Sequence, residues 1–408
     1  MAKSLPALPD EFRTGWPIIL ACSVAAGTGI VLVFLNFSMF IMPLSQDLGV
    51  SRGDLGAVQA LIITAAIGSP VMGRLADLFG VRRVYFASTL LLAAIHLMIA
   101  LYASNIYHMG MATAALGFLG VGTSSVVMTR PINAHFREHR GKALGLMAVG
   151  VSVVSMIAPP VLQWVLETWN WRAGFLAIGA ASLLIGLPVA ALLLPDSGRA
   201  GSGIGAAEDS APADRRFLRE RDFWLLTLSL IFMSLATAGT ISQLAPMIQD
   251  EGLDASVAAL ALSFFAAGQF VGRLGGGWLL DKFEPRRVSF ALTLAPAIGF
   301  IILLSTSGFV PAALLAAAII GLQQGAELDI FSYFVGRRFD VARYGTIYGA
   351  LVGLGWIGNV AGLLGMGQIY DLFGTYAPGQ MLGIAALVIS AGLVLLVRLP
   401  EPTKEQPA

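Results

Sequence analysis

The sequence predicts an all-α integral membrane protein in which twelve transmembrane helices form two six-helix bundles, related by a pseudo-two-fold axis. Three observations lead to this fold class. Of the 408 residues, 57% are hydrophobic and only 12% are charged, whereas a soluble domain has about 25% charged residues. Twelve apolar runs reach the length of about 20 residues that a helix needs to cross a bilayer. The two halves of the chain also repeat each other's turns.

The predicted spans follow one another with mostly short connections. Several are longer than a bilayer requires, which predicts that they tilt or kink. The 47 glycines agree with closely packed membrane helices, which favour small residues where they touch. The spans run over residues 16–42, 53–76, 84–103, 108–134, 142–166, 173–194, 222–248, 255–280, 287–306, 310–335, 344–370 and 377–398.

One long polar segment separates the sixth span from the seventh. Residues 195–221 are rich in Gly, Ala, Ser and Asp and contain several arginines. Such a composition does not bury a core and is typical of a linker. We therefore expect an N-terminal bundle over residues 1–194, a linker over 195–221 and a C-terminal bundle over 222–408.

The positive charges predict the orientation of the chain, because cytoplasmic connections carry an excess of Lys and Arg. Here they gather in alternate connections, which places both termini and the linker in the cytoplasm of a bacterium and the spans in its inner membrane. Besides the linker arginines, these connections hold Arg82, Arg83, Arg137, Arg140, Lys142, Lys282, Arg286, Arg287, Arg337, Arg338 and Arg343.

Two segments recur at nearly the same spacing. The charged turn Gly73–Arg83 returns 204 residues later as Gly277–Arg287, with Gly, Leu, Asp, Phe and the Arg pair in register. The segment Pro43–Gly49 returns 203 residues later as Pro246–Gly252. Two parallel halves around an axis along the membrane normal are typical of transporters, whose substrate site lies near the midplane between the halves.

The first charged turn resembles the loop motif of the major facilitator superfamily. The second copy has Glu284 where that motif has a glycine. The resemblance implies the superfamily's fold and transport by alternating access, with the two turns bracing the cytoplasmic ends of the helices. The matching positions are Gly73, Leu75, Asp77, Gly80, Arg82 and Arg83, and the bracing residues of the second turn are Asp281, Arg286 and Arg287.

Within the superfamily, the chain is similar to the branch of the monocarboxylate transporters and the oxalate/formate antiporter. The segment His135–Gly150 matches a pattern of that branch, and Arg273 stands where the branch has its substrate-binding arginine. Gln269 replaces the aspartate that the monocarboxylate transporters carry four residues earlier. Their helix-one lysine has no counterpart in Gly27–Phe40, nor the antiporter's helix-eleven lysine in Gly345–Ile369. A proton-carrying acid would therefore have to come from another position.

Ionisable residues inside spans cost about 2.5–3.5 kcal/mol each on insertion scales, so each requires a reason. Four lie well inside: Arg130, Arg273, Glu327 and Asp329. The planar guanidinium of Arg273 suits a carboxylate, and we expect it to bind substrate. The alternative is a permanent salt bridge to Glu327 or Asp329, and both arrangements can also alternate.

Glu327 and Asp329 are two residues apart on a predicted helix, so they point in roughly opposite directions. Burial favours the neutral form of a carboxyl and a nearby Arg favours the charged form. One of the two is therefore expected to carry the proton, unless both only neutralise the arginines. Arg130 is either a second anion ligand or a structural partner of span 310–335. Further candidates for lining the site, or for packing, are Asn36, Gln243, Tyr333 and Asn359.

The sequence argues against several other classes of protein. The net charge of +1 without a basic, aromatic patch argues against nucleic acid binding. One cysteine and four scattered histidines predict neither a metal site nor an enzyme, and no phosphate-binding loop for ATP is present. We expect no cofactor.

The sequence thus predicts a monomeric secondary transporter, embedded in the lipid bilayer, that moves a small organic carboxylate together with a proton. Organic anion exchange is the alternative, followed by proton-coupled multidrug or sugar efflux. Lactate-like, oxalate-like and aromatic acids all fit as substrates.

Overall fold

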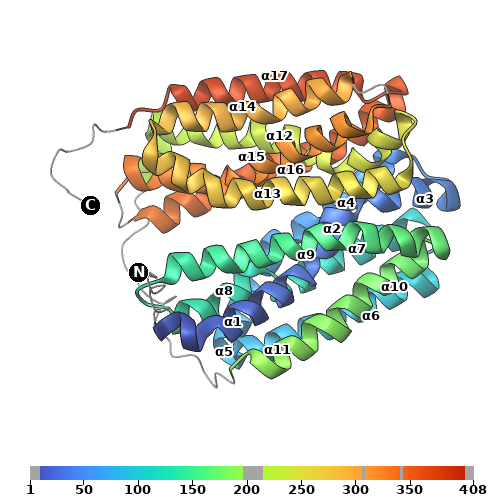
Figure 1. The fold of residues 1–408 in the computed structure, drawn as a ribbon, viewed down its shortest axis with the longest axis horizontal. Helices are drawn as coiled ribbons and strands as arrows, with labels where there is room; N and C mark the ends of the chain where they lie inside the picture. The colour runs from blue at the N-terminus through green and yellow to red at the C-terminus, as the bar shows by residue number, and fades with distance from the viewer. Residues whose placement is uncertain (1–9, 196–214, 306–307, 341–342, 400–408) are drawn as a thin grey trace, which may run out of the picture. The chain divides into compact units, whose positions relative to one another are not determined.

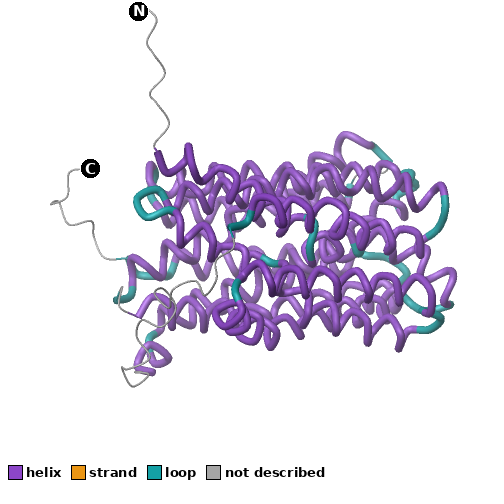
Figure 2. The backbone as a smooth tube through the Cα atoms, turned by 90° about the horizontal axis from the view of Figure 1, so that it is seen from below, coloured by secondary structure: helices purple, strands orange, loops and turns teal. Residues whose placement is uncertain are grey.

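The computed structural model describes residues 10–195, 215–305, 308–340 and 343–399 (Figure 1). Most of the predicted linker, residues 196–214, lies outside this part of the chain. Within it, all regular structure is helical, as Figure 2 shows. Among the described residues, eleven continuous helical segments are long and apolar enough to cross a membrane, and a bent pair near the N-terminus is a twelfth when it is taken as one span. The predicted all-α membrane fold is therefore confirmed.

The first predicted span is broken. Helix α1 (Asp10–Gly27) and helix α2 (Ile30–Asn36) meet at an angle of 46°, and α3 (Ser38–Leu48) continues beyond residue 42. The break falls at Thr28 and Gly29, where the backbone N–H of Ile30 donates to Oγ1 of Thr123 at 3.0 Å. A side chain thus replaces a helical acceptor at the bend, which is a common cause of kinks.

The structure divides into two compact units. The first comprises Met1–Val50 and Leu61–Ala207, and the second comprises Ser51–Ala60 and Glu208–Ala408. Helices of the first unit are α1 to α3, α5 (Thr64–Phe79), α6 (Val81–Tyr102), α7 (Ile106–Gly120), α8 (Ser125–His135), α9 (Arg140–Thr168), α10 (Trp171–Ala181) and α11 (Leu187–Leu193).

The second unit contains one helix that the sequence analysis had placed in the N-terminal bundle. Helix α4 (Arg52–Ala60) packs against α16 (Tyr344–Phe373), and a short 3-10 turn, Leu61–Ile63, separates α4 from α5. Glycines permit this close approach, because a Cβ at Gly367 would lie 2.5 Å from the carbonyl oxygen of Arg52. The other helices of this unit are α12 (Arg221–Asp250), α13 (Ala255–Lys282), α14 (Pro285–Leu304), α15 (Val310–Arg338) and α17 (Ala377–Leu395).

The two copies of the charged turn differ in backbone. Gly80, between α5 and α6, has φ +89° and ψ 147°, a conformation open almost only to glycine. Glu284, between α13 and α14, has φ −61° and is followed by Pro285 at the start of α14. The second turn therefore does not require the glycine of the first, which explains the departure at Glu284.

Candidate functional site

Helices α13 and α15 of the second unit pack backbone against backbone. A Cβ added at Gly268 or Gly272 of α13 would overlap a carbonyl oxygen of α15, and one at Gly321 or Gly325 of α15 would overlap a carbonyl oxygen of α13. Such contact of backbones is the usual effect of small residues spaced four apart on membrane helices. It fixes the positions of the side chains that flank the glycines, among them Arg273.

Arg273 and Asp329 lie across this contact from each other. Both are half-buried, and the charge of each acts on the other. A Cβ built on Gly276, three residues after Arg273, would lie 3.9 Å from Oδ2 of Asp329. The carboxylate of Asp329 therefore lies against the face of α13 that carries the glycines, close to the helical turn that holds Arg273.

Glu327 contacts a different helix. Glu327 is only 7% exposed. Oε1 lies 3.4 Å from the hydroxyl of Ser234 on α12, and Oε2 accepts a hydrogen bond of 2.9 Å from the amide of Gln324. The two acids of α15 thus have separate surroundings, one ionic and one made of neutral polar groups.

Two tyrosines lie near these acids. Tyr348 of α16 donates to the carbonyl oxygen of Leu328 at 3.4 Å. The charges of Asp329 and Glu327 both act on its hydroxyl. Tyr333, one turn further along α15, has the guanidinium of Arg337 5.5 Å from its ring centre. Among the described residues, no group of three or more His, Cys, Asp or Glu is placed to hold a metal ion.

Arg130 has a partner that the sequence analysis did not consider. In the first unit, its Nε lies 3.1 Å from Oδ1 of Asp77 in the loop motif. A Cβ on Gly73 would lie 3.2 Å from Nη2 of Arg130, so the glycine of the motif leaves room for this ion pair. Arg130 of α8 thereby braces the end of α5.

The other residues of the two turns lie at the ends of helices. Arg82 donates to the carbonyl oxygen of Ala191 at 2.8 Å, which joins α6 to α11. In the second turn, Arg287 pairs with Glu284 at 2.6 Å. Arg83 and Asp281 are exposed, as is Arg287, whereas Arg286 is half-buried.

Three further candidates were amides. Asn36 donates to the carbonyl oxygen of Leu32 at 2.8 Å, and its own Oδ1 is buried without a hydrogen-bond partner among the described residues. Gln243 of α12 accepts a hydrogen bond of 2.9 Å from the hydroxyl of Tyr376. Asn359 is half-buried on α16.

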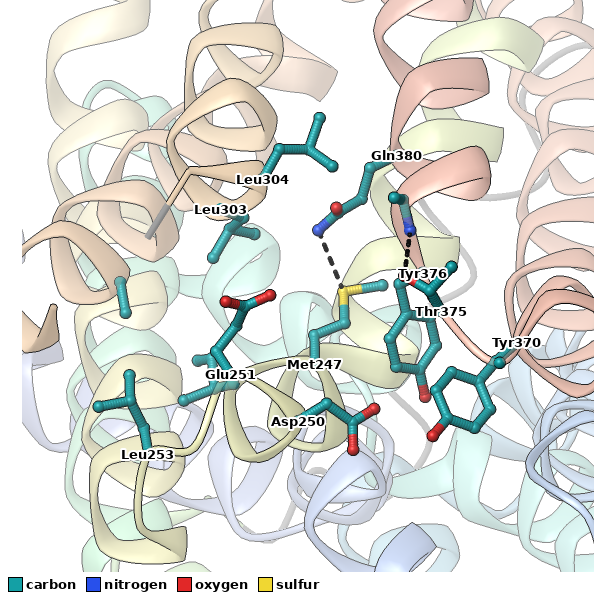
Figure 3. Close-up of a pocket in the computed structure, with 14 residues that line it drawn as sticks. Met247, Asp250, Glu251, Leu253, Leu303, Leu304, Tyr370, Thr375, Tyr376 and Gln380 are labelled. Carbon is teal, nitrogen blue, oxygen red and sulfur yellow. Dashed lines mark hydrogen bonds between the residues drawn. The ribbon is translucent and has the colours of Figure 1, made fainter. Parts of the chain in front are cut away.

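A buried arginine in the second unit was missed by the sequence analysis. Arg52 binds Asp250 through its terminal nitrogens Nη1 and Nη2 and donates to the hydroxyl of Tyr376 at 3.0 Å. Its guanidinium carbon lies 3.8 Å from the ring centre of Tyr370. Asp250 and both tyrosines line a cavity of about 460 Å³ (Figure 3), together with Met247 and other residues. The sequence offered one signal for this residue, because Arg52 stands directly before the expected span over residues 53–76.

Ionisable groups held among apolar membrane helices mark pathways for ions or substrates, so the class of protein that this fold and these charges define is a membrane transporter. The sequence matches the family model of the Major Facilitator Superfamily over residues 19–253 and 228–408. The chain belongs to this superfamily, and it is a transporter and not an enzyme.

Within the superfamily, the resemblance to monocarboxylate transporters is confirmed. The chain is 24% identical over 400 residues to monocarboxylate transporter 13 of Bos taurus, which covers 97% of this chain and 91% of the relative. It is 25% identical over 425 residues to a gallate transporter of Pseudomonas putida, with 91% of each chain covered.

Solved structures show the same fold. The nucleoside transporter NupG gives a TM-score of 0.79 at 14% identity, over 93% of this chain and 99% of that chain. A bacterial homologue of the human lysosomal transporter Spinster, in an inward-facing and unoccupied conformation, gives 0.74 at 18% identity, over 96% and 97%. At these identities the likeness bears on the fold alone.

Proposed function

We propose that this protein is a secondary active transporter that carries a small organic carboxylate together with a proton by alternating access. The observation that carries the proposal is the half-buried guanidinium of Arg273 in α13, whose charge and that of Asp329 act on each other. A guanidinium has five N–H donors, so a site that attracts one carboxylate can also take the carboxylate of a substrate. The names of the monocarboxylate and gallate transporters agree with an acid as substrate.

Proton coupling follows from the cost of moving charge. An anion that enters a low-dielectric site adds a negative charge, and a proton taken up by a nearby acid cancels it. Glu327 and Asp329 are the acids of α15, and Asp329 is the one whose charge acts on Arg273. The basic residues of the turns support a cytoplasmic position for both termini, and the pair of Arg130 and Asp77 braces one end of the first unit.

Ligand-induced stabilisation of the purified protein tests the anion site. Small carboxylates of the lactate, oxalate and benzoate type are screened by thermal shift on the wild type, Arg273→Ala and Arg273→Lys. A charge-assisted hydrogen bond contributes about 1.5–3 kcal/mol, so we expect Arg273→Ala to weaken binding at least tenfold. Arg273→Lys keeps the charge without the planar fork and should lie between the two.

The matched control is Arg398→Ala, since Arg398 is an exposed arginine near the end of the described chain. Stabilisation by a carboxylate that survives Arg273→Ala unchanged would remove Arg273 from the site. In proteoliposomes, carboxylate uptake that requires an anion inside the vesicle and is unaffected by a pH gradient would instead identify an organic anion exchanger.

A further inference from the structure

We infer that the two acids of α15 have separate tasks: Glu327 holds the transported proton, and Asp329 remains ionised as the counter-ion that sets how strongly Arg273 attracts an anion. This inference rests on the proposed function and assigns the roles that the sequence left open between the two residues. Three features of the second unit support it.

The first feature is the pair of hydrogen bonds on Glu327. Ser234 Oγ lies 3.4 Å from Oε1, and Gln324 Nε2 lies 2.9 Å from Oε2. A serine hydroxyl both donates and accepts, and an amide N–H donates to either form of a carboxyl. Glu327 therefore keeps both contacts whether it is ionised or protonated, which is what a site that takes up and releases a proton requires.

The second feature is the environment of Asp329. Its neighbour Arg273 stays protonated at any accessible pH and offers donors only. A protonated Asp329 would direct a neutral carboxyl towards this cation and lose the attraction between opposite charges. Asp329 is thus best satisfied as a carboxylate.

The third feature is the set of groups that the neighbouring helices present to these acids. Helix α13 presents Arg273, whose charge acts on Asp329, and α16 presents the neutral hydroxyl of Tyr348 to both acids. Helix α12 presents the hydroxyl of Ser234 to Glu327. Helix α14 meets α15 at Gly299 and the apolar side chain of Ile320. In the second unit, the positive charge therefore acts on Asp329, and Glu327 is held by neutral groups.

This arrangement couples the substrate flux to the proton flux while Asp329 stays ionised. When a substrate anion joins Arg273, the site gains one negative charge. Protonation of Glu327, which lies two residues before Asp329 on α15, restores the original charge. The loaded and empty sites then carry equal charge, so neither is penalised more than the other when it changes its exposure.

Proteoliposomes separate the two roles, with counterflow of a labelled carboxylate measured apart from substrate-induced proton movement. We expect Glu327→Gln to retain counterflow within about threefold of the wild type, a change below the 1.4 kcal/mol that corresponds to a factor of ten, and to lose proton movement and accumulation driven by a pH gradient. Asp329→Asn should keep proton movement and bind the anion more tightly, because the negative charge of Asp329 then no longer acts on Arg273.

Ser229→Ala is the matched control, because Ser229 is a buried serine of α12 that binds Ser390 of α17 and not an acid. If Glu327→Gln does not fold, Glu327→Met offers a second neutral side chain of similar length. Proton movement that persists with substrate in the neutral variant of Glu327, or that disappears in Asp329→Asn while counterflow remains, would overturn the inference. Absence of carboxylate counterflow in the wild type would contradict the proposed function itself.

Discussion

Asp250 binds the guanidinium of Arg52 through both carboxylate oxygens, at 2.5 and 2.9 Å. Its repeat counterpart in the first unit, Asp47, accepts hydrogen bonds of 2.9 Å from the indole of Trp171 and from Arg172. These two hydrogen bonds hold the pKa of Asp47 below its ordinary value. The repeated segment thus places an aspartate at the end of a helix twice, and the chain supplies its arginine from α10 in one case and from α4 in the other.

The two arginines should differ in their contribution to stability. Arg52 has a side chain only 10% exposed, against 37% for Arg172. Loss of one partner from a buried ion pair costs about 3–5 kcal/mol, whereas an exposed pair contributes about 0–1 kcal/mol. Since 29% of the Asp250 side chain is exposed, we expect Arg52→Ala to destabilise by about 3 kcal/mol.

Thermal or denaturant unfolding of the purified protein measures this difference, with Arg172→Ala as the matched variant from the other copy of the repeat. Asp250→Asn should fall close to Arg52→Ala, because it leaves the same guanidinium uncompensated. Equal and small effects of Arg52→Ala and Arg172→Ala would show that the bidentate pair does not stabilise the second unit.

The glycines between α13 and α15 give a second prediction. A methyl group at Gly272 would overlap the carbonyl oxygen of Leu322, whereas one at Gly275 meets nothing within 4 Å. Gly272→Ala must push the two helices apart, and overpacking of this kind costs about 1–3 kcal/mol. Gly275→Ala should be neutral or stabilise by up to about 1 kcal/mol, as alanine favours a helix over glycine.

The same pair of variants reports on the site. Separation of α13 from α15 displaces the guanidinium of Arg273 from its place in the site, so Gly272→Ala should lower carboxylate binding as well as the unfolding temperature. Gly275→Ala, in the same helix, should leave binding unchanged. A Gly272→Ala protein with wild-type stability and wild-type binding would contradict the close backbone contact.

Patterns of hydrophobicity and repetition predicted most of the fold, because they depend only on which residues face lipid and on how the chain was duplicated. The helices α12 to α17 begin and end within a few residues of the expected spans. The length of the first span predicted a kink, but its place at Gly29 depends on Thr123, a residue from a distant part of the chain whose side chain replaces a backbone acceptor.

The candidate site was predicted less completely, for a similar reason. Charges inside apolar runs identified Arg273, Glu327 and Asp329 from the sequence. Which acid faces the arginine depends on how α15 is rotated against α13, and that rotation is fixed by glycine contacts that a linear pattern does not contain. The partner of Arg130, Asp77, was hidden because it stands in a motif that the sequence analysis assigned to the ends of helices.

The two charged turns give a third prediction. Gly80 has φ +89° and ψ 147°, and a side chain at such a position costs about 1–3 kcal/mol of backbone strain. Gly80→Ala should therefore destabilise the protein by this amount. Glu284→Ala, at the equivalent position with φ −61°, should change stability by less than about 0.5 kcal/mol, as most surface substitutions do. Unfolding curves of both variants provide the comparison, and a Gly80→Ala protein as stable as Glu284→Ala would argue against the conformation of the first turn.

The last prediction concerns the turn between α8 and α9, which lies in the segment similar to the monocarboxylate transporters. Glu11 of α1 accepts hydrogen bonds from the backbone N–H groups of Arg137, Glu138 and His139, at 3.0, 3.3 and 3.1 Å. Hydrogen bonds to a charged acceptor contribute about 1.5–3 kcal/mol, and a donor that loses its acceptor costs further free energy where water does not replace it.

We expect Glu11→Ala to free these three amides and Glu11→Gln to retain part of the interaction, because an amide offers one accepting oxygen instead of two. Hydrogen–deuterium exchange measures this directly, as faster exchange of residues 137–139 in the order wild type, Glu11→Gln, Glu11→Ala. Asp10→Ala changes the exposed acid next in sequence and should leave the exchange of the turn as it is in the wild type. If Glu11→Ala and Asp10→Ala exchange alike, the turn is held by its packing, in which Phe136 lies 5.2 Å from the ring of Phe12, and not by the carboxylate.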